Sequence, residues 1–162
     1  MQHTISVLMV NRFGVLSRIS GLFSGRGFNI ESLNVAETND PNISRMTIVT
    51  RGDDKKIEQI TKQLNKLVDI IKVIDITDEK FVDREMVLVK MNAEPRVREE
   101  ILRIVQIFRA KVVDATPSTY TIEITGDEGK VTGFLDLLKP LGIKELVRSG
   151  RIAMTRGTKS IN

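Results

Sequence analysis

The two halves of this 162-residue chain repeat one pattern at a spacing of 74 residues. That shift places Thr47-Ile48 on Thr121-Ile122 and Gly52-Asp53 on Gly126-Asp127. A repeat of this length indicates a duplicated domain, whereas solenoid repeats are shorter. The chain is therefore expected to fold into two units of the same architecture.

The first half has the element order βαββαβ. Apolar residues recur three and four positions apart in each expected helix, and Asp53 supplies an N-cap for the second one. Breaks fall at Gly25-Arg26-Gly27 and Asn39-Asp40-Pro41-Asn42, which are typical of a helix end and a turn. The expected elements are strands at 5–10, 28–37, 46–50 and 70–76, and helices at 15–23 and 57–67.

The second half follows the same order. Pro95 suits the first turn of a helix, and Pro140 with Gly142 is expected to stop the last helix. The expected elements are strands at 86–91, 112–113, 120–125 and 143–147, helices at 97–108 and 131–138, and an added edge strand at 152–154. The predicted fold class is α+β, with two tandem ferredoxin-like βαββαβ domains. Each has both helices on one face of a four-stranded antiparallel sheet.

A short polar linker at 78–83 separates the halves, so we expect one domain at 1–77 and a second at 84–162. The linker contains neither proline nor glycine and predicts a hinge rather than a flexible tether. The first strand carries apolar residues on both faces, as Ile5 and Leu8 show. A second copy of the chain is the simplest cover for the face without helices. The alternative is that the two halves cover each other.

Composition excludes several classes of function. The chain has no cysteine, which excludes thiol catalysis and disulfides and fits a reducing compartment. The net charge is +1 for residues 1–80 and +3 for 81–162, and aromatic residues make up only 4%, so no nucleic-acid surface is expected. Apolar runs are strand-sized and no signal-peptide pattern is present, so we expect a cytoplasmic protein with no membrane contact.

Catalytic and metal-binding residues are not expected. The single histidine, His3, is placed at the exposed edge of the first strand, where a role as general base is disfavoured. Asp53 and Asp54 suit a helix N-terminus better than a metal site. No phosphate-binding glycine motif follows a strand.

The candidate binding site is the strand-to-helix loop Asn11-Arg12-Phe13-Gly14-Val15-Leu16, together with Asn29 and Ile30. A helix that begins near Gly14 offers N–H groups to a carboxylate, and glycine lets a ligand approach the backbone. The amides of Asn11 and Asn29 suit the carboxylate and ammonium of a free amino acid. Aliphatic contacts are expected from Val15, Leu16, Ile30 and Val35. The structural alternative is that Gly14 serves the turn, Asn11 caps the helix and Asn29 is left-handed.

The loop belongs to a longer run of motifs. Asn11 to Ile19 is followed by Gly21-Leu22-Phe23 and by Arg26 to Leu33. Further motifs are Ser44 to Thr47, Arg84-Glu85-Met86, Val113-Asp114 and Arg148-Ser149-Gly150. In this order they resemble the regulatory (small) subunit of acetolactate synthase, with an ACT domain as the first half. The resemblance covers nearly the whole chain.

The resemblance implies a regulatory subunit with no active site of its own. Such a subunit binds and activates the catalytic large subunit, which carries thiamine diphosphate and Mg²⁺. It also confers feedback inhibition by a branched-chain amino acid, usually valine, in valine, leucine and isoleucine biosynthesis.

The same resemblance implies a homodimer through the ACT domains. The effector then lies between the loop of one chain and the asparagine-bearing loop of its neighbour. The matching positions here are Asn11, Gly14 and Asn29, with Arg12 through Leu16 and Ile30 around them. Phe13 is bulkier than the small residue or proline expected there.

Two other functions remain open at this stage. One is a free-standing ACT-type amino-acid sensor that regulates another enzyme or a transcription regulator. The other is an acylphosphatase, because those enzymes share the fold and use an arginine in the strand-to-helix loop and an asparagine on the neighbouring strand. Arg12 and Asn29 would mimic that pair, although fold alone does not carry function.

Overall fold

The computed structural model describes residues 1–162 and divides into two units. The first unit consists of Met1–Val82 and Arg151–Asn162, and the second unit is Asp83–Gly150. The segment Arg151–Asn162, expected in the second domain, thus belongs to the first unit. The chain crosses between the units twice, and the second unit is an insertion in the first.

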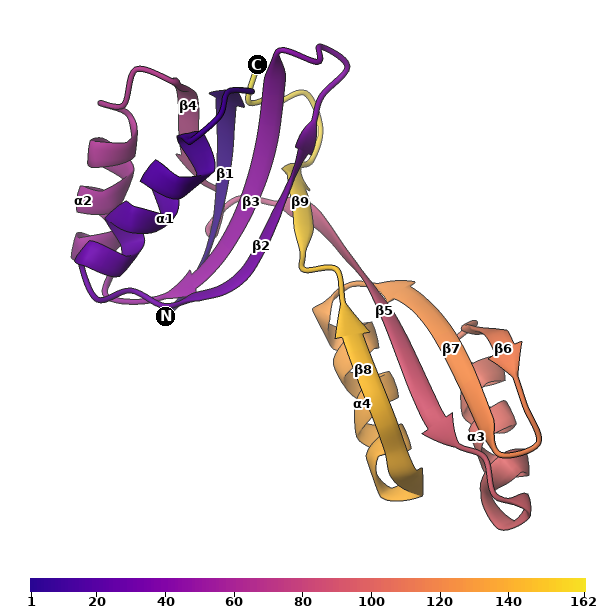
Figure 1. The fold of residues 1–162 in the computed structure, drawn as a ribbon. Coiled ribbons are helices and arrows are strands. Elements are labelled where there is room, and N and C mark those ends of the chain that lie inside the picture. The colour runs from indigo at the N-terminus through magenta and orange to yellow at the C-terminus, as the bar shows by residue number, and fades with distance from the viewer. The chain divides into compact units, whose positions relative to one another are not determined.

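The first unit is a βαββαβ sandwich of one sheet and two helices (Figure 1). Its sheet has the antiparallel order β2-β3-β1-β4, and both helices cover the same face, as expected. Its elements are β1 (Gln2–Val10), α1 (Val15–Gly25), β2 (Ile30–Glu37), β3 (Ile43–Arg51), α2 (Asp54–Leu64) and β4 (Ile70–Asp75).

The core of the first unit lies between this sheet and its helices. Alternate residues of β1 point into it, because side chains along a strand alternate between the two faces. Ile5 and Val7 are fully buried there, together with Ile19 and Phe23 of α1. Asp53 caps α2 by accepting a hydrogen bond from the Lys55 amide at 2.8 Å, which confirms the expected N-cap.

The C-terminal segment covers the other face of this sheet. Thr4, Ser6 and Leu8, which alternate with the core residues of β1, are also buried. The strand β9 (Ile152–Thr155) lies against β1 and β3, and Ile161 is only 5% exposed. This segment comes from the second half of the sequence, so the alternative that one half of the chain covers the other is confirmed for residues 151–162. The residues that cover this face belong to the first unit itself.

The second unit repeats the topology of the first. Its elements are β5 (Phe81–Asn92), α3 (Pro95–Ile107), β6 (Lys111–Ala115), β7 (Thr119–Gly126), α4 (Glu128–Gly142) and β8 (Ile143–Arg148). The order β6-β7-β5-β8 matches that of the first sheet, so the internal repeat is confirmed. Because β5 begins at Phe81, part of the expected linker at 78–83 is strand.

The core of the second unit centres on two aromatic rings. Phe108 and Phe134 meet edge to face, with ring centroids 5.5 Å apart. Pro140 lies inside α4, which runs on to Gly142, so the prediction that Pro140 stops the helix is wrong. None of the helices is long and apolar enough to cross a membrane.

Candidate functional site

Gly14 starts α1 in a left-handed conformation. Its φ of 84° lies in the region that favours glycine, and no side chain caps the helix. The Val15 amide donates to the Arg12 carbonyl at 3.5 Å. The next amides of a first helical turn have no acceptor within the helix, so they remain available to an anion. The expected helix start at Gly14 is confirmed, and the backbone there suits a ligand carboxylate.

Asn11 ties this loop to the end of β2. Its side-chain amide donates to Glu37 Oε1 at 3.1 Å and to the Pro41 carbonyl at 3.0 Å. Its backbone N–H donates to the Asn42 carbonyl at 2.7 Å. Asn11 does not cap α1, so that part of the structural alternative is wrong.

Arg12 forms an ion pair with Asp69, the residue before β4. Its Nη1 lies 3.3 Å from Asp69 Oδ1, and Arg18 Nη1 lies 2.7 Å from Asp69 Oδ2. The Asp69 side chain is 5% exposed, and its two arginine partners supply the positive charge that a buried carboxylate needs. Arg12 therefore fixes the loop rather than offering a free guanidinium.

The remaining loop residues divide between core and solvent. Val15 is 2% exposed and packs in the core, whereas Phe13 is fully exposed and Leu16 is 41% exposed. Ile30 and Val35 also pack against the core, so the expected aliphatic pocket of Val15, Leu16, Ile30 and Val35 is not formed in one chain.

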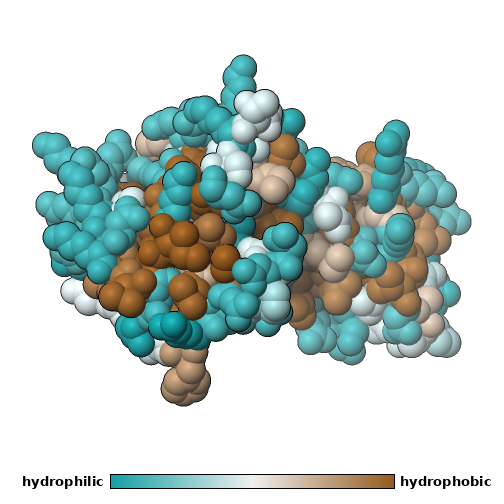
Figure 2. Space-filling view, turned by 90° about the horizontal axis from the view of Figure 1, so that it is seen from above, coloured by the Kyte–Doolittle hydropathy of each residue, from teal (hydrophilic) through white to brown (hydrophobic).

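Apolar side chains are exposed around this end of the first unit. Val68 and Ile71, which flank the start of β4, are exposed together with Phe13 and Leu16. Figure 2 looks onto this end of the unit, which is uppermost in Figure 1, and shows hydrophobic side chains gathered among polar ones. We call these four residues the apolar end surface.

Asn29 and Ile30 lie at the opposite end of the same sheet. Ile30 pairs with Thr50, which also pairs with His3 at the start of β1, while the loop of Asn11 follows the end of β1. The step from His3 to Val10 spans about 24 Å at about 3.4 Å per residue. One chain therefore does not bring Asn11 and Asn29 together.

Two further interpretations of these residues are wrong. Arg12 and Asn29 are as far apart as Asn11 and Asn29, so an acylphosphatase-like pair is not formed. Asn29 is not left-handed either, because Arg109 is the only residue other than glycine with a positive φ. The Asn29 carbonyl instead accepts a hydrogen bond from Thr50 Oγ1 at 2.7 Å.

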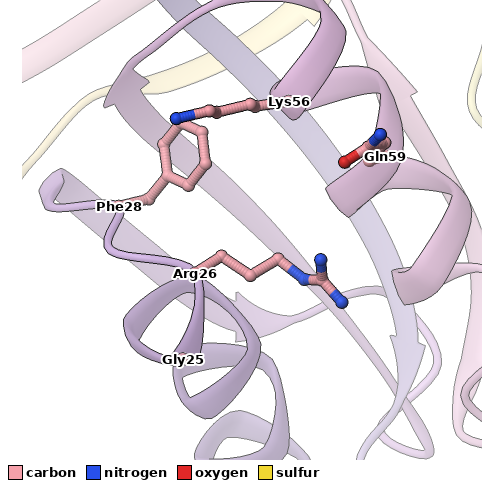
Figure 3. Close-up of a pocket in the computed structure, with 5 residues that line it drawn as sticks. All are labelled: Gly25, Arg26, Phe28, Lys56 and Gln59. Atoms are coloured by element: carbon pink, nitrogen blue, oxygen red, sulfur yellow. The ribbon is translucent and has the colours of Figure 1, made fainter.

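A polar cavity of about 270 Å³ lies between the end of α1 and α2. It is lined by Gly25, Arg26, Phe28, Lys56 and Gln59. One of the residues that line it, Phe28, directly precedes Asn29 in the sequence. Figure 3 shows Arg26 extending toward α2 and Lys56 extending toward the Phe28 ring. The sequence interpretation missed Arg26, Lys56 and Gln59. The only signal was the spacing of Lys56 and Gln59, which puts them on one side of α2.

His3 is buried, contrary to expectation. Its residue exposure is 4%, with Nδ1 at 2.8 Å from Asp75 Oδ2 and Nε2 at 3.0 Å from Asp54 Oδ1. The ring therefore joins the start of β1 to the first turn of α2 and the end of β4. This position is structural, because both ring nitrogens are occupied by protein partners.

The comparisons with known proteins match both units. Residues 5–72 fit the family model described as an AHAS small subunit-like ACT domain, and residues 84–157 fit the small subunit of acetolactate synthase. The probable acetolactate synthase small subunit of Archaeoglobus fulgidus is 54% identical over 159 residues, which is 98% of this chain and 99% of that protein. The chain belongs to the acetolactate synthase small-subunit family.

Other relatives agree with this assignment. The acetolactate synthase isozyme 3 small subunit of Escherichia coli is 48% identical over 98% of both chains. The crystal structure of the acetolactate synthase small subunit from Thermotoga maritima has a TM-score of 0.88 and 41% identity, covering 98% of this chain and 99% of that one. The first unit is accordingly an ACT domain, and membership of a small-subunit family implies a larger partner subunit.

Proposed function

We propose that this chain is the non-catalytic regulatory subunit of an acetolactate synthase in the cytoplasm. It binds the catalytic large subunit, raises its activity and makes it sensitive to a branched-chain amino acid, with valine as the first candidate. Thiamine diphosphate and Mg²⁺ then belong to the catalytic subunit. The supporting observation is the uncapped start of α1 at Gly14, in a chain of this family.

The effector site in this proposal needs two copies of the chain. β2 is an edge strand of the ACT sheet, so its outer side is available for pairing. An antiparallel pairing of two β2 strands about a two-fold axis places Ile30 of one copy opposite Glu37 of the other. Because Asn11 holds Glu37, the Asn29 loop of one copy then reaches the Asn11 loop of its neighbour.

The residues gathered in this way suit an amino acid. The first-turn amides after Gly14 receive the carboxylate, and the amide oxygen of an asparagine receives the ammonium. Arg26 and Lys56 line the cavity beside Asn29 and add positive charge for the carboxylate. An effector held by both copies stabilises one arrangement of the dimer. A coupling of about 1–3 kcal/mol is typical of such regulation.

The apolar end surface gives this arrangement a route to the catalytic subunit. Phe13 and Val68 are almost fully exposed, and Phe13 lies in the same loop as Gly14. Exposed apolar side chains gathered on one surface are typical of protein contacts. We assign the contact with the catalytic subunit to this surface. A change in the conformation of the loop when the effector binds at Gly14 then alters this contact directly.

A mixed dimer tests the composite site. Chains with Gly14→Asp and chains with Asn29→Ala each lose effector binding as homodimers in this proposal. In a heterodimer of the two, one composite site carries both changes and the other carries neither. Calorimetry should therefore find one more L-valine site in the heterodimer than in either homodimer. A heterodimer with no more valine sites than the two homodimers, while the wild type has two more, would contradict a site shared between chains.

A further inference from the structure

A second cavity, of about 290 Å³, opens on the face of the ACT sheet that the C-terminal segment covers. We call it the turn cavity, because it lies beside the turn between β2 and β3. It is lined by Leu8, Thr38, Asn39, Asp40, Ile43, Arg45 and Asn162. All of these belong to the first unit, and none belongs to the proposed effector site. Its volume lies just below the usual range for ligand pockets, about 300–1,000 Å³.

Arg45 is a half-buried cation of this cavity without an anionic partner. Its Nη2 donates to Ser6 Oγ at 3.0 Å and to the Ala153 carbonyl at 3.1 Å, and both acceptors are neutral. Its Nε and Nη1 groups have no hydrogen-bond partner in the protein. Burial lowers the pKa of Arg45, because desolvation penalises the charged form. A bound anion would offset that penalty.

Asp40 brings the opposite charge to the same cavity. Its Oδ1 accepts from the Asn42 backbone N–H at 2.9 Å and from Asn42 Nδ2 at 3.1 Å. Its Oδ2 accepts no hydrogen bond, and no lysine or arginine pairs with it. Asp40 and Arg45 therefore line one cavity, and each lacks a partner of opposite charge.

The floor of the turn cavity is apolar. Leu8 is 6% exposed, and Ile43 is partly buried at the start of β3. A cation, an anion and an aliphatic floor in one small cavity are complementary to one class of molecule. Free aliphatic amino acids carry a carboxylate, an ammonium and an apolar side chain on a single carbon.

We propose that the turn cavity is a second amino-acid site, complete within one copy of the chain. The ligand carboxylate binds Nε and Nη1 of Arg45, its ammonium binds Oδ2 of Asp40, and its side chain lies on Leu8 and Ile43. Because Arg45 also holds the Ala153 carbonyl, the ligand steadies the C-terminal segment on the sheet. This site does not depend on the composite effector site.

The test is calorimetry of the full-length chain carrying Gly14→Asp, which removes the composite site. L-Valine should still bind at one site per chain. Asp40→Asn keeps the Oδ1 acceptor for Asn42 but loses the charge, and Arg45→Gln loses the guanidinium. Each change should weaken the remaining binding about tenfold or more. Asp136→Asn and Arg103→Gln, exposed changes in the second unit, are the matched controls and should have no effect.

Two analogues test the chemistry of the site. Isobutylamine lacks the carboxylate of valine and 3-methylbutanoate lacks its ammonium, so each should bind far more weakly than L-valine. The absence of any binding to the Gly14→Asp chain would overturn the second site and leave the composite site standing. Equal binding of 3-methylbutanoate and L-valine would overturn it too, since Asp40 would then have no role. Circular dichroism checks that the Arg45→Gln chain is folded. If that chain is unfolded, the Asp40→Asn chain provides the test.

Discussion

The ring of Phe28 lies directly on Gly52, where a β-carbon would overlap with Cε1 of the ring. Gly52 directly follows β3, and Phe28 lies in the loop that precedes β2. The contact therefore joins the end of β3 to the loop that contains Asn29. Phe28 also lines the cavity beside Asn29. Because Gly52 has no side chain, the Phe28 ring can lie at this position and form one wall of the proposed effector site.

Gly52→Ala should displace the Phe28 ring and lower the free energy of unfolding by about 1–3 kcal/mol, the usual cost of overpacking. It should also weaken the response to L-valine. Gly21→Ala is the control, because a β-carbon there meets open space in the middle of α1 and should stabilise by about 0.5–1 kcal/mol. Urea unfolding measures both. Equal effects of the two changes would contradict the role given to the Phe28 contact.

L-Valine should stabilise the chain against heat. At about 100 times its dissociation constant, a ligand of the native state adds about 2.7 kcal/mol, which is several degrees for a protein of this size. D-Valine should give no shift, since the composite site is chiral. Differential scanning calorimetry of the wild type with L-valine, L-leucine, L-isoleucine and D-valine identifies the effector. An equal shift with D-valine would argue against a specific site.

Phe13→Ser and Val68→Ser should weaken the contact with the catalytic subunit. Both side chains are exposed, so the free energy of unfolding should change by no more than about 0.5 kcal/mol. Activation of the purified large subunit should require more of the variant chain than of the wild type. Val113→Ser, at an exposed position in the second unit, is the control. Unchanged activation curves would mean that the partner binds elsewhere.

Ile161→Ala should lower the free energy of unfolding by about 2–3 kcal/mol, because its side chain is buried. Ile152→Ala, in the same segment, is the matched control: that side chain is 51% exposed and should cost about 0.5 kcal/mol or less. Urea unfolding compares the pair. Similar losses for both variants would show that the C-terminal segment is not held on the sheet through Ile161.

Glu31 should contribute to stability at neutral pH but not in acid. Gln2 Nε2 donates to Glu31 Oε2 at 2.8 Å, and with nearby Arg51 this lowers the pKa of the carboxyl group. Its contribution is therefore complete above the unfolded-state pKa of about 4.3 and is lost as the pH falls through the lower folded-state value.

Glu31→Gln should accordingly lower the urea midpoint slightly at pH 7, by about 1 kcal/mol or less in free energy, and have no effect near pH 2. Glu99→Gln, at an exposed position of α3, is the control at both pH values. A loss at pH 7 that persists unchanged in acid would show that the charge of Glu31 is not its cause.

The sequence predicted the features that depend on neighbours along the chain. The helices, the turn at residues 39–42, the helix start near Gly14 and the repeat follow from local periodicity and turn chemistry. It failed where distant segments meet. His3 is buried by carboxylates 51 and 72 residues away, and Arg45 meets a carbonyl 108 residues away.

The separation of Asn11 and Asn29 has a topological cause. α1 returns the chain to the opposite end of the sheet, so a residue before this helix and a residue after it lie at opposite ends. Spacing along the sequence does not reveal this, because both asparagines sit in loops at the margin of the same sheet. In the proposed dimer, pairing of the two β2 edge strands brings Asn29 of one copy close to Asn11 of the other.

The insertion of the second unit into the first has a consequence for biosynthesis. A ribosome makes the chain from Met1 onward, so residues 83–150 are complete before Arg151–Asn162 emerge. While the inserted unit is translated, the face of the ACT sheet that lies opposite its helices is therefore not yet covered. The segment Arg151–Asn162, made after the inserted unit, completes the domain that began first, so a stop codon shortly after Gly150 damages the N-terminal domain rather than the inserted one.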